Sequence, residues 1–306
     1  AIKLAFEKSR SDDRKKWLLN YNKDEILENS EKKVSYENFI NLELKHFSND
    51  DNMRSIPCMI DGMKPSQRKI LFGSYLRNLD KDEVKVSQLA GFVSDKACYH
   101  HGEASLTGAI VGMAQNYVGS NNVNVLVPNG QFGTRLKGGK DSASPRYIWT
   151  QISDTALKIF KKTDFPILNQ QVDDGIPIEP EYYIPIVPMI LVNGSEGIGT
   201  GFSTKLAPHS LDAIIDNIYR IMDGKKFKFM KPYWNNFQGI VKKIDKNNFE
   251  VYGVYETDKK NNTINITELP VGEWTSNYKE FLEKQLENKH KHFIGYRDNN
   301  TDVNVY

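Results

Sequence analysis

The sequence is poor in cysteine, and this limits how the chain can be held together. Only Cys58 and Cys98 occur among its 306 residues. Small domains that depend on disulfides carry many more cysteines, so a disulfide framework is disfavoured and a reducing compartment is indicated.

The chain also lacks a long apolar run and an excess of one sign of charge. Without a run of 18 apolar residues or a signal peptide, nothing indicates membrane insertion or secretion. Lys and Arg number 41 against 39 Asp and Glu, so local charge must decide the partner. The length predicts two or three domains of mixed α/β build. The chain starts without Met and stops in a predicted strand, so we expect a fragment.

Familiar nucleotide and metal motifs are incomplete. The run GGKD at 138–141 has Asp where a P-loop needs Ser or Thr, and the glycines of 194–202 do not form G-x-G-x-x-G. The pair of acids at 80–82 has no third carboxylate nearby in the sequence. His100 and His101 are adjacent and cannot share a metal as helical i, i+4 pairs do. The sequence therefore predicts no metal site in this chain.

The first half of the chain has the pattern of a solvated segment followed by three helices. Residues 1–46 are rich in charged and amide side chains, which predicts a linker rather than a core. Helices are predicted from Pro65 to residue 77, over 86–101 and over 103–118. Arg68 and Lys69 give the first of these helices a basic polar face.

A helix-turn-helix followed by a wing is the outline predicted for residues 47–186. The last two helices meet at a short Gly-containing turn, and 123–135 alternates around Asn129-Gly130 as a hairpin does. Residues 187–306 form a second predicted domain. It contains a helix over 211–223, alternating strands over 239–245, 249–256 and 263–269, and a helix near 277–288.

A basic loop with little side-chain bulk occupies residues 133–147. Its four cations oppose one Asp, a net of +3, and its glycines would let backbone approach a phosphate. A merely solvated loop is the alternative. Tyr147 follows Arg146 directly. A phenol, whose pKa is ordinarily about 10, becomes a nucleophile where a cation stabilises its phenolate, although most tyrosines only pack.

Five longer runs together resemble the breakage-reunion core of eukaryotic-type DNA topoisomerase II, a type IIA topoisomerase. They are RSIPCMIDGMKPSQRKIL, YHHGEASL, VLVPNGQFGTRLKGGKDSASPRYIWT, IPIVPMILVNGSEGIGTGFST and ITELPVGEWT. The resemblance covers nearly the whole chain in one order. It implies an α+β fold, with a winged-helix DNA-gate domain at 47–186 and a truncated tower domain with an antiparallel sheet at 187–306. Residues 1–46 would then be the linker that leaves a Toprim domain.

The resemblance also implies roles for particular residues. Tyr147 would attack one DNA strand and form a transient 5′-phosphotyrosyl bond, while Arg146 stabilises the phosphoryl transition state. His101 and Arg54 would gather around the scissile phosphate, and Ile198 would insert as a wedge between base pairs. The remaining DNA-contacting positions that it implies are Arg14, Lys15, Lys64, Tyr99, Ser105 and Trp274.

The family's activity is transient double-strand cleavage and religation, which allows ATP-dependent passage of one duplex through another. Mg²⁺ and ATP are expected to bind to Toprim and ATPase domains missing from this sequence. The expected partners are double-stranded DNA, a second copy of the chain and those two domains, and the expected location is the nucleus. A purely architectural winged-helix protein is the competing hypothesis, disfavoured by the Arg146-Tyr147 pair. A tyrosine recombinase is excluded, because neither His100 nor His101 begins an H-x-x-R element.

Overall fold

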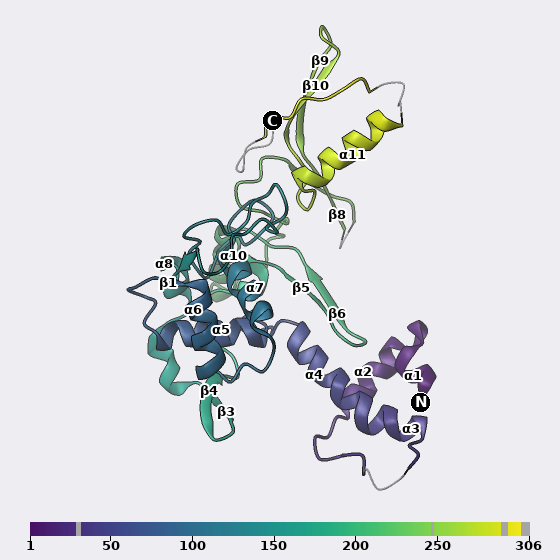
Figure 1. Cartoon of the computed structure of the whole chain (residues 1–306), viewed down its shortest axis with the longest axis vertical. Helices are drawn as coiled ribbons and strands as arrows, with labels where there is room; N and C mark the ends of the chain where they lie inside the picture. The colour runs from purple at the N-terminus through teal and green to yellow at the C-terminus, as the bar shows by residue number, and fades with distance from the viewer. Residues whose placement is uncertain (29–31, 246–247, 289–292, 301–306) are drawn as a thin grey trace.

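The computed structural model describes residues 1–28, 32–245, 248–288 and 293–300. Mixed helices and small antiparallel sheets build the chain, as predicted. Figure 1 shows a central body, with the N-terminal helices at one end and the last hairpins and helix at the other.

The N-terminal segment has a small core of its own. Its elements are α1 (Ile2–Phe6), a 3₁₀ turn (Lys8–Arg10), α2 (Ser11–Leu19), α3 (Tyr36–Asn38), a π-helical stretch (Phe39–Leu44) and α4 (Lys45–Ser55). Ala5, Trp17, Leu18 and Ile40 pack together, and the Trp17 indole donates to Asn41 Oδ1 at 2.9 Å. The expectation that this segment contributes no core is therefore wrong. Its apolar residues are sparse, and they meet only because α2 packs against the helices that follow it.

Three helices form the main core at the predicted places. They are α5 (Pro65–Leu76), α6 (Val86–Lys96) and α7 (Glu103–Ala114). Leu71, Leu89 and Ile110 are fully buried among them. The third helix ends at Ala114, earlier than predicted, because Gln115 takes up an extended backbone conformation.

The predicted basic face of α5 is not present at the surface. Arg68 is buried and pairs with Asp61 at 2.7 Å, and the ammonium of Lys69 lies 3.0 Å from the carboxylate of Glu179. Each cation is neutralised by a carboxylate on another segment. The sequence alternation alone could not show these partners.

The predicted hairpin around Asn129-Gly130 is wrong. Asn129 instead pairs with Trp149, and Leu126 pairs with Ile152, so residues 130–148 form one long loop between the paired segments. Beside them β1 (Val84–Lys85) pairs with β2 (Trp149–Thr150). Gly130 has a φ of +108°, and a Cβ there would lie 2.9 Å from the side chain of Ile148. The glycine thus serves close packing at the start of the loop.

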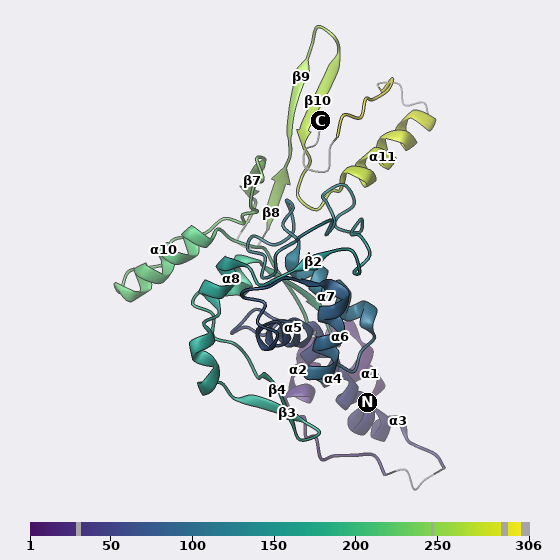
Figure 2. The same ribbon diagram turned by 60° about the vertical axis from the view of Figure 1, so that its left-hand side comes forward.

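The elements after residue 150 complete the body and build the C-terminal end. They are α8 (Asp154–Ile159), a 3₁₀ helix (Lys162–Ile167), β3 (Gln170–Asp173), β4 (Ile176–Pro180), α9 (Met189–Val192), β5 (Ser195–Ile198), β6 (Ser203–Leu206), α10 (Leu211–Met222), β7 (Ile240–Lys243), β8 (Phe249–Tyr252), β9 (Val254–Asp258), β10 (Thr263–Glu268) and α11 (Thr275–Glu287). The predicted C-terminal strands are confirmed. They form two ladders, β7 with β8 and β9 with β10. Figure 2 shows α10 projecting from the body and the β9–β10 hairpin beside α11.

One hydrophobic core includes residues on both sides of the predicted boundary at 186/187. It contains Met63, Ile110 and Ile159, but also Met189 and Ile214. The division into domains stays a prediction. Within the described ranges, no helix has both the length and the apolar character needed to cross a bilayer. Cys58 and Cys98 are both free thiols.

Candidate nucleic-acid interface

Tyr147 is an exposed side chain on a firmly held segment. Its side chain is 71% exposed, whereas the next residue, Ile148, is fully buried. The backbone on either side is fixed to the start of α6. Ser87 N–H donates to the carbonyl of Pro145 at 3.1 Å, and Val86 N–H donates to that of Ile148 at 3.0 Å. The phenol therefore projects into solvent from a rigid support.

Arg146 lies beside this phenol. Its guanidinium carbon is 5.9 Å from the centroid of the Tyr147 ring. No carboxylate among the described residues forms an ion pair with it, and its side chain is exposed. A free guanidinium next to a phenol can stabilise both a phenolate and a phosphoryl group under attack.

The basic loop carries fewer available cations than its sequence indicates. Arg135 is buried in an ion pair with Glu268, and it also donates to the carbonyl of Leu269 at 2.6 Å. Burial raises the pKa of Asp141, but hydrogen bonds from Thr134 outweigh burial and hold that pKa below its ordinary value. The exposed cations that remain are Lys137, Lys140 and Arg146.

Trp274 fastens this loop to the C-terminal end of the chain. Its half-buried ring meets Tyr117 edge to face, with centroids 5.9 Å apart. The N–H and the hydroxyl of Ser276 both donate to the carbonyl of Leu136, at 2.9 and 2.8 Å. Trp274 therefore has a packing role in this structure, and its contact with DNA stays a prediction.

Gly138 lies under the Trp274 ring, and this predicts a stability difference. Its φ is +59°, and an added Cβ would lie 2.4 Å from the indole. Gly138→Ala is expected to lower the free energy of unfolding by about 1–3 kcal/mol more than Gly224→Ala does. Gly224 is the matched control, because its φ is +68° but nothing lies within 4 Å of the added Cβ. Chemical denaturation of both variants measures the difference, and equal losses would contradict the contact.

The turn before α7 brings two of the predicted residues together. The rings of Tyr99 and His101 meet edge to face, with centroids 5.4 Å apart. His100 Nε2 lies 2.9 Å from Asp173 Oδ2 and so joins the turn to β3. Ser105 is exposed in the first turn of α7. No hydrogen bond or ring contact in the described parts joins His101 to Tyr147.

The β5–β6 hairpin presents Ile198 to solvent. Ile198 is 78% exposed, so it is not a buried strand residue. A Cβ at Gly197 would lie 2.2 Å from the carbonyl oxygen of Ser55, and one at Gly199 would lie 2.2 Å from Asn52 Oδ1. These glycines let the hairpin lie directly on α4, and they leave the isoleucine as its projecting side chain.

The remaining predicted cations differ in exposure. Arg14 is 7% exposed and donates to the carbonyls of Leu4 and Glu7, at 3.1 and 2.7 Å. Lys15 is exposed and pairs with its neighbour Asp12. In the body, half-buried Lys64 directly precedes α5 and donates its N–H to Gln67 Oε1. The structure gives Arg14 a packing role, and DNA contact by these residues stays a prediction.

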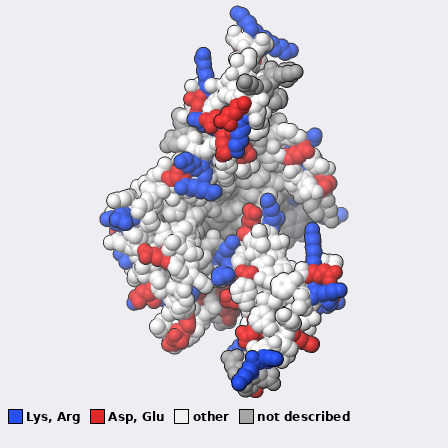
Figure 3. Space-filling view, turned by 45° about the vertical axis from the view of Figure 1, so that its right-hand side comes forward, with Lys and Arg blue, Asp and Glu red and all other residues white. Residues whose placement is uncertain are grey.

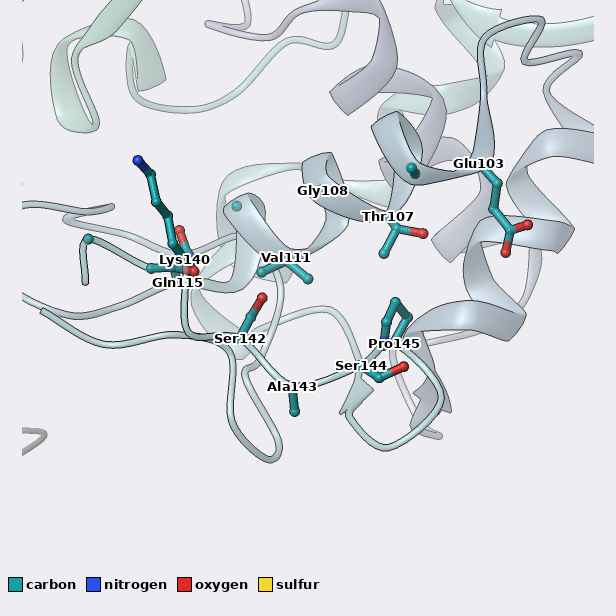
Figure 4. A pocket seen from close by; sticks show the side chains of 14 residues that line it. Glu103, Thr107, Gly108, Val111, Gln115, Lys140, Ser142, Ala143, Ser144 and Pro145 are labelled. Atoms are coloured by element: carbon teal, nitrogen blue, oxygen red, sulfur yellow. Dashed lines mark hydrogen bonds between the residues drawn. The ribbon is translucent and has the colours of Figure 1, made fainter. Parts of the chain in front are cut away.

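A cleft of about 690 Å³ separates α7 from the basic loop. Figure 4 shows Thr107 and Val111 of the helix facing Ser142 and Pro145 across it. Figure 3 shows that the molecule is hollowed between its parts, with Lys and Arg interspersed with acidic side chains on this face. The cleft leaves no signal in the sequence, because its lining is small and uncharged along most of its length.

Comparisons with known proteins place this chain in a family. A family model for DNA gyrase/topoisomerase IV matches residues 54–306, and one for the C-terminal associated domain of TOPRIM matches residues 1–52. DNA topoisomerase 2 of Acanthamoeba polyphaga mimivirus is 54% identical over 94% of this chain and 23% of its own length. Human DNA topoisomerase 2-alpha is 47% identical over 100% of this chain and 21% of its own.

A solved structure agrees with these matches. The DNA-binding, cleavage and re-ligation domain of Plasmodium falciparum topoisomerase II has a TM-score of 0.90 and 44% identity, over 99% of this chain and 42% of that one. The fold is that of a type II topoisomerase core. The chain belongs to the DNA gyrase/topoisomerase IV family, which confirms the resemblance seen in its motifs. It spans about a fifth of the length of the curated relatives named above.

Proposed function

We propose that this chain carries the DNA cleavage and religation site of a type II topoisomerase. The observation that carries the proposal is the exposed phenol of Tyr147, held on a rigid segment beside the unpaired guanidinium of Arg146. In the whole enzyme this site would open both strands of one duplex for ATP-dependent passage of another.

The proposed reaction is a reversible transesterification. The phenolate oxygen of Tyr147 attacks phosphorus and forms a P–O bond, the bond from phosphorus to the 3′ oxygen breaks, and the 3′-hydroxyl takes up a proton. The DNA 5′ end is thereby attached to the protein, and attack by the 3′-hydroxyl reverses the step. Because one phosphoester replaces another, religation needs no external energy. Arg146 is proposed to stabilise the charge at phosphorus.

Other residues are proposed to bind and shape the DNA. His101 and Arg54 would lie near the scissile phosphate, and Ile198 would enter a base step and bend the duplex, since its exposed side chain suits a wedge. Contacts with the duplex are proposed for Arg14, Lys15, Lys64, Tyr99, Ser105 and Trp274. The winged-helix domain at 47–186 and the tower domain at 187–306 are part of the same proposal.

Mg²⁺ and ATP are proposed to bind to other domains of the enzyme. In the described ranges, no three His, Cys, Asp or Glu side chains lie together as metal ligands. This chain thus offers no fitting donor set, and we propose that Toprim and ATPase domains supply both groups. A homodimer would provide one Tyr147 for each strand, and a nuclear location is proposed from the family.

Covalent trapping tests the proposal. The chain is combined with a Toprim region, supercoiled plasmid and Mg²⁺, and the reaction is stopped with denaturant. We expect protein attached to DNA 5′ ends. Binding and bending of DNA without any attachment would instead support an architectural protein.

A further inference from the structure

Asp51 connects two parts of the molecule that are far apart in the sequence. Its Oδ2 accepts a hydrogen bond from the hydroxyl of Thr200 at 2.8 Å, and Thr200 lies in the turn between β5 and β6. Its Oδ1 accepts from Ser55 at 3.3 Å and lies 3.4 Å from a guanidinium nitrogen of Arg54. One half-buried carboxylate thus contacts both α4 and the hairpin that presents Ile198.

The contact is specific and involves the charged carboxylate. The next residue, Asn52, donates its side-chain N–H to the carbonyl of Thr200 at 3.1 Å. The hydrogen bond from Thr200 is the largest influence on Asp51 and holds the pKa of its carboxyl below the ordinary value, despite partial burial. The hairpin is therefore bound to α4 by side chains as well as by the close approach of its glycines.

Ile198 would need this support to act as a wedge. Separating two stacked bases costs a few kcal/mol, so a wedge works only if its backbone does not yield. A two-stranded hairpin is only marginally stable alone, and the β5–β6 ladder pairs only four residues of each strand. We propose that Asp51 is a positioning residue that holds the Ile198 hairpin against α4, and so couples DNA bending to the helix bearing Arg54. This inference rests on the proposed function.

Three substitutions and one control separate this role from a general effect of charge. Asp51→Asn removes the charged acceptor, Thr200→Val removes the hydroxyl donor with little change of volume, and Thr200→Ser restores the donor. Asp50→Asn is the control, because Asp50 is exposed on the same helix and none of the described contacts involves its side chain.

Two measurements follow on each variant. Hydrogen exchange of the amides in 195–206 is measured on the full chain without DNA. Bending of a duplex labelled at both ends is measured at saturating protein, with the Toprim region present. Asp51→Asn and Thr200→Val are expected to speed exchange about tenfold. We also expect both to lower the bent fraction severalfold, while Thr200→Ser and Asp50→Asn stay within about twofold of wild type in both measurements.

The outcomes distinguish this inference from the proposed function. Wild-type exchange or bending in both Asp51→Asn and Thr200→Val would overturn the positioning role. Equal effects of Asp50→Asn and Asp51→Asn would also overturn it, since charge alone would then be responsible. Formation of the wild-type adduct in the same samples tests the proposed function separately. A chain that cleaves DNA but bends it without regard to Asp51 would refute only this inference.

Discussion

Tyr147→Phe is expected to abolish the covalent adduct between this protein and DNA. Phenylalanine keeps the ring that lies near Arg146 but has no oxygen to attack phosphorus. Loss of a covalent nucleophile removes the reaction path itself, so the adduct should fall by at least about 10³-fold. Because the phenol is 71% exposed, the fold and the affinity for DNA should hardly change. Denaturant trapping measures the adduct, and gel retardation measures binding.

Tyr219→Phe is the matched control for this experiment. Tyr219 is another exposed tyrosine, on α10, and it is 64% exposed. Its substitution should leave adduct formation at the wild-type level. An adduct that persists in Tyr147→Phe and disappears in Tyr219→Phe would show that the nucleophile had been assigned to the wrong residue.

Local patterns predicted the helices well, because each was written in its own segment. Pro65 marks the start of α5, and the apolar spacing of Leu106 and Ile110 predicted α7. The wing failed for the opposite reason. Asn129-Gly130 has the composition of a tight turn, yet pairing with Trp149 placed the strand partner far along the chain. A turn preference of this kind yields to a long-range contact that buries more surface.

The same distinction holds for the candidate site. Tyr147 and Arg146 are neighbours, so the sequence alone could pair them. Arg135 looked available because its carboxylate partner lies 133 residues further on. Thr200 lies 149 residues from Asp51, and no local pattern announces that contact. Charge counted along a window therefore overstates how many cations a nucleic acid could reach.

Asp61→Asn is expected to destabilise the protein more than any surface substitution. Asp61 is fully buried and accepts hydrogen bonds from Arg68 at 2.7 and 3.2 Å. It also accepts the N–H groups of Met63 and Tyr183, at 2.9 and 3.1 Å. Asparagine keeps the shape but has no charge, and its amide group would face these donors. A guanidinium left buried without its carboxylate should cost about 3–5 kcal/mol of unfolding free energy, measurable by urea denaturation.

Asp13→Asn is the control for this prediction, because Asp13 forms an exposed ion pair with Arg10 at 2.8 Å. Surface pairs of this kind contribute at most about 1 kcal/mol. Removing both buried charges, in Asp61→Asn combined with Arg68→Met, should recover part of the loss, since no unpaired charge then remains in the core. If Asp61→Asn cost no more than Asp13→Asn, the guanidinium of Arg68 would have to reach water in the folded protein. The segment from Asp61 to α5 would then be open where the structure shows it closed.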